Sequence, residues 1–154
     1  MAHFLGEFEC KLDTKGRMVL PAGLKKQMPE VEREGLVINR GLEAHLVIYP
    51  RKEWDRIMEE LSRLNTFERK TREFVRKFMR GATELTLDAA NRVLVPKPLL
   101  EYAGIDGEVV LASQFNKIEM WAKDAYDAQW DDEGDDFAAL AEEVMGNLNK
   151  RLDG

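Results

Sequence analysis

Two nine-residue segments of this chain, DTKGRMVLP (13–21) and DAANRVLVP (88–96), carry Asp, Arg and Pro at the same three positions. This repeat constrains the fold more than any other feature, because a turn that recurs with its flanking pattern indicates a duplicated structural unit. The shared residues are Asp13, Arg17 and Pro21 in the first segment and Asp88, Arg92 and Pro96 in the second.

The first segment is typical of two short strands joined by a tight turn. FECKL (8–12) alternates apolar and polar residues, as a half-buried strand does, and RMVL (17–20) resumes as a strand after the turn. Within the turn, Asp13 can accept a hydrogen bond from backbone two residues further on, and Gly16 tolerates a positive φ. We therefore expect Asp13 and Gly16 to structure this turn.

A short helix and two more strands are expected to complete the first copy. Pro21 lacks only the N–H that the first position of a helix does not need, so we expect a helix over residues 22–28. The apolar segments LVINR (36–40) and HLVIY (45–49) predict two strands after it.

The second copy repeats this order of elements. TELTL leads into the DAAN turn, where Asp88 is repeated and Asn91 replaces Gly16, because Asn also tolerates left-handed backbone. A helix is expected over residues 96–104, with Gly104 closing it. The last two strands are predicted at EVVLASQ and KIEMW.

Helices are expected after the last strand of each copy, with an aromatic residue at matched positions, Trp54 and Tyr126. Between the copies, residues 50–64 predict one helix, and Asn65 with Glu68 forms a capping-box pattern for a second helix over 66–80. That helix has a basic side, which is either a solvated face at a subunit boundary or a supplementary surface for a polyanion such as nucleic acid. The basic side comprises Arg69, Lys70, Arg72, Arg76, Lys77 and Arg80, and the apolar side Phe67, Thr71, Phe74, Val75 and Phe78.

Charge is divided unevenly along the chain. Residues 1–80 hold 17 basic and 13 acidic side chains, whereas residues 81–154 hold 6 basic and 16 acidic ones. The net charge of −6 therefore does not exclude a nucleic-acid partner, because local charge decides what a surface binds.

The remaining composition favours a cytoplasmic protein without membrane contact. A single cysteine, Cys10, excludes an internal disulfide and fits a reducing compartment. The apolar runs are far shorter than the ~20 residues of a membrane span. No secretory-signal pattern precedes residue 15.

The first turn is rich in positive charge. Lysine and arginine side chains at a turn and at the start of a helix can neutralise phosphates, and the two-donor fork of Arg17 can read guanine. A two-stranded ribbon is also narrow enough to enter a major groove. We therefore predict DNA-binding roles for Lys11, Lys15, Arg17, Lys25 and Lys26. The alternative for Arg17 is that it only closes the turn as an ion pair with Asp13.

The second turn carries less charge, since Ala90, Leu100 and Glu101 stand where the first copy has lysines. For Arg92 the purely structural role is therefore favoured, with DNA binding as a secondary role. The second copy is expected to keep the scaffold and to have lost most of the phosphate-facing charge.

Enzymatic and metal chemistry find little support. The doubled Asp resembles an aspartic-protease dyad, but that family needs a contiguous Asp-Thr/Ser-Gly, which neither turn contains. His3, His45 and Cys10 lack zinc-type spacing. Residues 131–142 follow a calcium-loop template except at the sixth position, where Asp136 replaces the required Gly. We expect no catalytic residue, no cofactor and no metal.

With both turns, the linking helices and the segment QFNKIEMW (114–121), the sequence resembles the MraZ family of bacterial transcriptional regulators. It is related more distantly to AbrB-type swapped-hairpin DNA-binding domains. The resemblance covers residues 4 to about 130. It implies an α+β fold in which two pseudo-twofold-related AbrB-like halves (swapped-hairpin or double-split βαβ) share a β core, with a helical linker between them. The helical spacing of apolar residues in the tail adds a C-terminal helix.

The repeat, the linking helices and the amphipathic pattern of the tail set the expected boundaries, and the tail lies beyond the resemblance. The first half is expected at 4–53, a helical linker pair at 54–80, the second half at 81–130, and an acidic segment with an amphipathic C-terminal helix at 131–154. That helix packs on its own or a neighbouring subunit, or docks a partner protein. Its apolar residues are Phe137, Leu140, Ala141, Val144, Leu148 and Leu152.

Proteins of this family form ring-shaped oligomers that bind short repeated sequences upstream of the division and cell-wall gene cluster, usually repressing it and their own gene. In AbrB-like domains, basic residues before the turn, the turn Arg and two basic residues of the following helix face DNA. Lys11, Arg17, Lys25 and Lys26 match these positions. The resemblance therefore implies a cytoplasmic, nucleoid-associated repressor that binds repeated promoter elements in double-stranded DNA as a homo-oligomer. The alternatives are an oligomeric protein-binding scaffold and an antitoxin-like module that holds a toxin through the tail.

Overall fold

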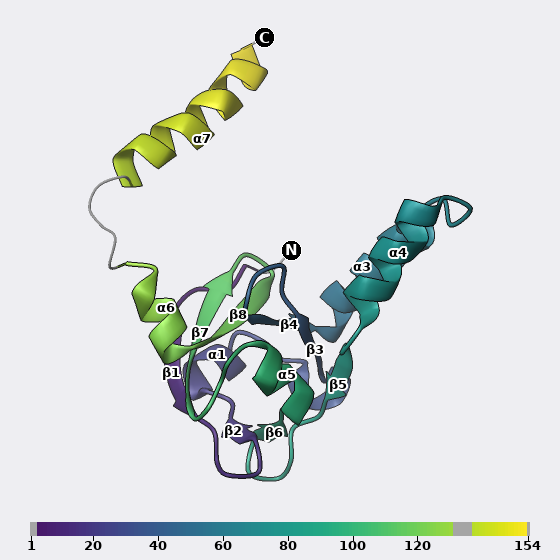
Figure 1. Ribbon diagram of the computed structural model, residues 1–154. Coiled ribbons are helices and arrows are strands. Elements are labelled where there is room, and N and C mark those ends of the chain that lie inside the picture. The colour runs from purple at the N-terminus through teal and green to yellow at the C-terminus, as the bar shows by residue number, and fades with distance from the viewer. Residues whose placement is uncertain (1–2, 131–136, 154) are drawn as a thin grey trace. The chain divides into compact units, whose positions relative to one another are not determined.

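A computed structural model describes residues 3–130 and 137–153 of the chain (Figure 1). The chain forms two compact units, Met1–Lys123 and Asp124–Gly154. Of the helices in the described residues, none combines the length and the apolar content that crossing a membrane requires.

Both copies of the repeat have the same order of four strands, and they differ by one helix. The first copy comprises β1 (Glu7–Lys11), β2 (Arg17–Val19), α1 (Ala22–Lys25), α2 (Val31–Glu34), β3 (Leu36–Arg40) and β4 (Leu46–Pro50). The second copy comprises β5 (Thr83–Leu85), β6 (Arg92–Leu94), α5 (Lys97–Tyr102), β7 (Glu108–Gln114) and β8 (Lys117–Ala122). Between α5 and β7 the second copy has no helix that corresponds to α2.

The strands of the two copies interleave in one six-stranded sheet with the order β1-β7-β8-β4-β3-β5. In this sheet β1, β3 and β4 of the first copy correspond to β5, β7 and β8 of the second. Exchanging the members of each pair reproduces the strand order in reverse, so a pseudo-twofold axis passes between β4 and β8. Each edge strand pairs with a strand of the other copy, β1 with β7 and β5 with β3. This exchange confirms the predicted α+β fold with two interleaved AbrB-like halves.

The two central strands of the first copy, β3 and β4, are buried on both faces. Ile38 and Ile48 face a large core that also takes in α1 and α5. Val37 and Val47 point to the opposite face, where a smaller cluster includes Trp54. Because successive side chains of a strand alternate between faces, a strand covered on both faces has a continuous apolar sequence, as LVI does here.

Helices α3 (Arg51–Ser62) and α4 (Arg69–Met79) form an arm that extends from the sheet (Figure 1). At its base, the ring of Trp54 packs 5.4 Å from Tyr49 and stacks 5.8 Å from Phe78. The predicted capping box at the start of α4 is wrong, because Asn65 accepts a hydrogen bond from the N–H of Phe67 at 3.0 Å and closes a turn before the helix. Phe67 consequently lies outside α4 and is 94% exposed.

The two short helices after the repeated turns differ from each other. The helix predicted over 22–28 ends at Lys25, and the chain continues in tight turns to Pro29, which has no N–H to extend a helix. The helix predicted over 96–104 is present as α5 and ends as expected, with Gly104 at a positive φ of 64°.

The second unit contains most of α6 (Lys123–Ala128) and all of α7 (Phe137–Asp153), which is the predicted C-terminal helix. Several of the predicted apolar side chains of α7 are exposed, among them Phe137, Leu140 and Val144. The predicted acidic segment, 131–136, lies outside the described residues.

Candidate nucleic-acid interface

The strands that follow the two repeated turns pair with each other as a separate two-stranded ribbon, β2–β6, at one end of the first unit (Figure 1). The register pairs Arg17 with Leu94 and Val19 with Arg92. Because successive side chains point to opposite faces, these four share the outer face of the ribbon, and the residues between them are buried. Both arginines therefore lie on one surface that is built by both copies of the repeat.

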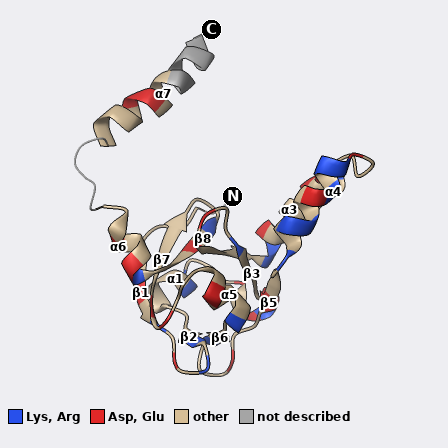
Figure 2. Ribbon diagram, viewed as in Figure 1, with Lys and Arg blue, Asp and Glu red and all other residues tan. Residues whose placement is uncertain are grey.

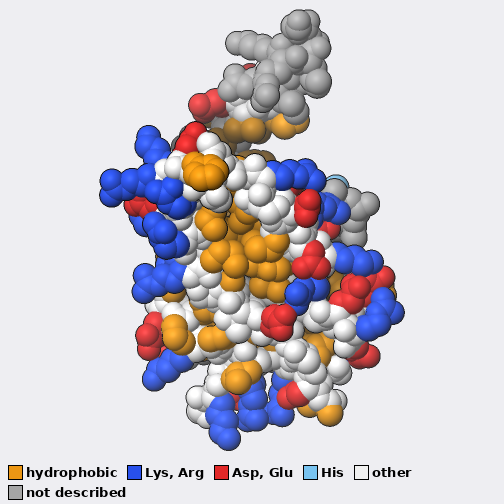
Figure 3. Space-filling view, turned by 90° about the vertical axis from the view of Figure 1, so that its right-hand side faces the viewer, with side chains coloured by type: hydrophobic (Ala, Val, Ile, Leu, Met, Phe, Trp, Pro, Cys, Tyr) orange, Lys and Arg blue, Asp and Glu red, His pale blue; other side chains and the backbone are white. Residues whose placement is uncertain are grey.

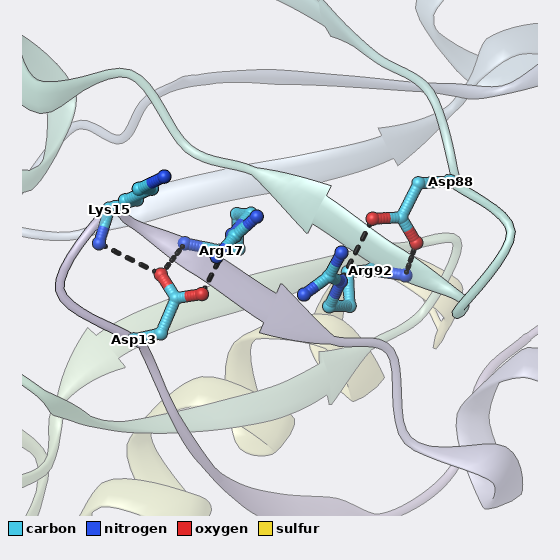
Figure 4. Close-up of polar contacts among 5 residues, drawn as sticks. All are labelled: Asp13, Lys15, Arg17, Asp88 and Arg92. Atoms are coloured by element: carbon cyan, nitrogen blue, oxygen red, sulfur yellow. Dashed lines mark hydrogen bonds and ion pairs between the residues drawn. The ribbon is translucent and has the colours of Figure 1, made fainter.

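Asp13 organises the first turn through hydrogen bonds to both of its carboxylate oxygens (Figure 4). Oδ1 accepts from the backbone N–H groups of Lys15 and Arg17, at 2.9 Å each. Oδ2 accepts from Nε of Arg17 at 2.7 Å. Gly16 occupies the position of the turn that needs a positive φ, at 87°.

The second turn repeats these contacts with the corresponding atoms (Figure 4). Oδ1 of Asp88 accepts from the N–H groups of Ala90 and Arg92, at 2.9 Å each, and Figure 4 shows the bonds to Arg92. Oδ2 of Asp88 accepts from Nε of Arg92 at 2.8 Å. Asn91 takes the left-handed position with a φ of 61°.

Each turn is also bonded to the strand end of the other copy. The N–H of Val95 donates to the carbonyl oxygen of Gly16, and the N–H of Leu20 donates to the carbonyl oxygen of Asn91, both at 2.9 Å. The left-handed residue of each turn thus accepts a bond from the residue that precedes the proline of the other repeat. These reciprocal bonds fix the two turns side by side.

The hydrogen bonds of the turns keep both carboxylates ionised. The pKa of Asp13 is lowered to about 2, chiefly by the hydrogen bond from the backbone N–H of Arg17. The Arg17 guanidinium lowers this pKa further. The pKa of Asp88 is lowered for the same reason, chiefly by the N–H of Arg92. Each arginine is therefore held by a permanent negative charge at neutral pH.

The structure uses only one side-chain nitrogen of each arginine to brace the turn. Nε of Arg17 and Nε of Arg92 bond to their aspartates, while their terminal nitrogens have no hydrogen-bond partner in the part of the chain described. The two side chains are 34% and 35% exposed. The ion pair that closes the turn and a free fork of donors therefore coexist in the same side chain.

The predicted lysines fall into two groups. Lys11, Lys15 and Lys26 are exposed. Lys25, in contrast, donates from Nζ to the carboxylate of Glu32 and, at 2.8 Å, to Oδ1 of Asn91. Lys25 thus links α1 to the turn of the other copy, and two of its three donors are taken.

The surroundings of the second turn are poorer in cations, as its sequence indicates. Ala90 and Glu101 are exposed, and Leu100 packs against the core. Lys97 is exposed at the start of α5. The two turns therefore share one backbone geometry and present different surfaces.

Three residues near the turns were not singled out from the sequence. Glu32 pairs with Lys25, and Val19 and Leu94 are exposed on the outer face of the ribbon. The signal that could have identified Val19 and Leu94 is the alternation of strand side chains in RMVL and RVLV. It puts each of these two residues on the same face as the arginine two positions earlier.

The ribbon end combines fixed geometry with positive charge. The space-filling view shows Lys and Arg side chains at this end of the first unit (Figure 3), and Figure 2 colours the Lys and Arg residues of the ribbon blue beside acidic residues of the two turns. Ammonium and guanidinium groups of this kind bind phosphate oxygens and the acceptor atoms of bases. Among the described residues, no group of three His, Cys, Asp or Glu side chains is placed to hold a metal ion.

Interleaved halves that share a sheet and project a common two-stranded ribbon define an AbrB-like protein with both halves in one chain. A family model described as "MraZ protein, putative antitoxin-like" matches the chain twice, over residues 3–77 and 78–148. The chain belongs to the MraZ family.

Proteins named "Transcriptional regulator MraZ" resemble the chain over nearly its full length. The protein from Christiangramia forsetii is 43% identical over 148 residues, which is 96% of each chain. The protein from Flavobacterium psychrophilum is 44% identical over 97% of this chain and 96% of its own. The protein from Cytophaga hutchinsonii is 36% identical over 97% and 99%. This name describes a non-enzymatic role in transcription, in agreement with the expectation that the chain is not an enzyme.

Proposed function

We propose that the β2–β6 ribbon with its two turns is a DNA-binding surface, and that the chain regulates transcription by binding double-stranded DNA. One observation carries the proposal. Arg17 and Arg92 are each fixed through Nε by an ionised aspartate and keep their terminal donors on one outer face. A ribbon fits the major groove, where a guanidinium pairs with O6 and N7 of guanine. Fixing the side chains beforehand reduces the conformational entropy that binding would otherwise cost.

The lysines around the first turn are proposed to bind phosphates. Lys11, Lys15 and Lys26 are exposed and close in sequence to the turn or to the helix after it. Each phosphate contact releases counterions, which makes binding dependent on salt. Lys25 is proposed to act mainly by holding α1 against Asn91, with its remaining donor available to a phosphate.

The chain is further proposed to act as a homo-oligomer, in the form of a ring, on repeated promoter elements. Four or five phosphate contacts per protomer give weak binding alone. Two protomers on successive repeats bind at high effective concentration, which adds about 10²–10⁴ in affinity without new contacts. The proposed role is that of a cytoplasmic, nucleoid-associated repressor of its own gene and of the division and cell-wall cluster. A protein that sediments as a monomer at DNA-binding concentrations would contradict this assembly.

The test is binding to promoter DNA across a salt series for the wild type, Arg17→Ala and Lys26→Ala. We expect Arg17→Ala to lose about 1–3 kcal/mol and part of the sequence preference, because it removes a base contact. Lys26→Ala should weaken binding to all sequences alike and flatten the salt slope by about one.

Arg63→Ala is the matched control, because it removes the same charge from an exposed residue of the α3–α4 arm. It should bind as the wild type does. Equal losses for Arg17→Ala and Arg63→Ala would mean that net charge, and not the ribbon, determines binding.

A second candidate function rests on the other unit. The matching family is described as antitoxin-like, and α7 exposes Phe137, Leu140, Val144 and Met145. An exposed apolar helix face of this kind suits a partner protein. If the wild type retards no duplex at low salt, this protein-binding role, with or without a toxin as the partner, replaces DNA binding.

A further inference from the structure

Two aliphatic side chains lie on the outer face of the ribbon beside the arginines. Val19 is 56% exposed and Leu94 is 58% exposed. In the register of the ribbon, Arg17 stands opposite Leu94 and Val19 stands opposite Arg92, so the two cations and the two aliphatic groups alternate around a square. The face that holds the braced arginines is therefore partly apolar.

The duplication makes this arrangement more than a chance exposure. Single exposed apolar residues are ordinary on protein surfaces, but Val19 and Leu94 occupy the same position in the two copies, two residues after the turn arginine. The second copy has no lysine at positions 90, 100 and 101, which match the lysines of the first copy. It nevertheless has an exposed aliphatic side chain at Leu94. Its own core does not use this side chain, because the buried residues of β6 and the next position are Val93 and Val95.

The major groove offers one apolar group to such a side chain, the C5-methyl of thymine. We propose that Val19 and Leu94 read thymine methyl groups within two base pairs of the bases that Arg17 and Arg92 contact, an inference that rests on the proposed DNA-binding function. The dimensions agree. Residues two apart on a strand are separated by ~6.6 Å, which is close to two base-pair steps of 3.4 Å. The arginines on the same face argue against a purely apolar partner, because such a partner would bury their terminal N–H donors without offering an acceptor.

The experiment compares thymidine with deoxyuridine, which lacks only the C5-methyl group of the base. The probe is a duplex that the wild type selects from a random-sequence library, synthesised once with thymidine and once with deoxyuridine. We expect the wild type to bind the deoxyuridine duplex about fourfold more weakly for each methyl contacted. The doubly substituted Val19→Ser, Leu94→Ser protein should bind both duplexes with equal affinity. Leu42→Ser, which removes an exposed aliphatic group from the β3–β4 loop, should keep the wild-type difference.

Each result separates this inference from the function on which it rests. A wild type that selects and binds no duplex overturns the proposed function itself. A wild type that binds both duplexes equally overturns the inference and leaves DNA binding intact, and this result does not depend on whether the serine variant folds. A preference for thymine that persists in a folded Val19→Ser, Leu94→Ser protein would also overturn it, because the methyl groups would then be read elsewhere.

Discussion

The two repeated turns are alike in their hydrogen bonds and unlike in their surroundings. The bond from the arginine Nε to the aspartate is 2.7 Å long in the first turn and 2.8 Å in the second, and the backbone bonds to the aspartates correspond one to one. Around them, Lys15, Lys25 and Lys26 of the first copy correspond to Ala90, Leu100 and Glu101. The comparison teaches that the backbone of this turn is specified by very few residues, which leaves the surrounding positions free to change.

Reciprocal pairing explains why both turns keep the same geometry. Each turn supplies the carbonyl oxygen that accepts a bond from the other copy, at Gly16 and at Asn91. Distorting one turn would therefore leave a buried N–H of the other copy without its partner, which costs free energy. The surface charges carry no such constraint, so one copy can lose them while the ribbon remains intact.

The largest expected difference between the turns lies at their left-handed residues. Gly16→Ala should lower the free energy of unfolding by about 1–2 kcal/mol, because L-residues disfavour a positive φ and a Cβ here would lie 3.0 Å from the carbonyl oxygen of Val95. Asn91→Gly should change it by less, since glycine relieves the left-handed backbone while the hydrogen bond to Lys25 is lost. Urea unfolding measures both. Equal losses of stability for the two variants would contradict this expected difference.

A smaller effect concerns pH. The lowered pKa of Asp13, about 2, means that its ionised form is stabilised by folding. This contribution is present above the ordinary carboxyl pKa and is lost as the pH falls toward the folded value. Asp13→Asn should therefore weaken the dependence of stability on pH between about 4 and 2. Asp88→Asn should act in the same direction, because its pKa is lowered by the corresponding contacts.

Urea unfolding at a series of acidic pH values, with the carboxyl carbons of both aspartates followed by NMR, checks this second comparison. The two variants should resemble each other, since the same set of bonds holds both carboxylates. An Asp13 carboxyl that titrates at its ordinary pKa would contradict the bonding described for the first turn.

Local features of this fold were predictable from the sequence, and long-range ones were less so. The doubled turn, the strands beside it and the positive φ of Gly16 and Asn91 follow from residue type and spacing. The tether from Lys25 to Asn91 joins residues 66 positions apart, and no local pattern reports such a contact. The capping box at Asn65 failed because the same side chain can close a turn just before a helix.

The site was predictable to a similar degree. Sequence pattern placed the candidate arginines and lysines at the turns and at the helix that follows, because charge and turn position are local properties. It could not divide the lysines into exposed and tethered ones, since that depends on where Glu32 and the second turn lie in three dimensions. The exposure of Val19 and Leu94 depends likewise on the pairing of β2 with β6.

The most direct test of the account exchanges one charge between the two turns. Lys15 and Ala90 are exposed and occupy matching positions, so Lys15→Ala and Ala90→Lys change charge without changing the turn. If both tips face the DNA backbone, Lys15→Ala should flatten the slope of log binding constant against log salt concentration by about one, and Ala90→Lys should steepen it by about one. An identical slope for the wild type and both variants would contradict the claim that these two braced tips bind DNA.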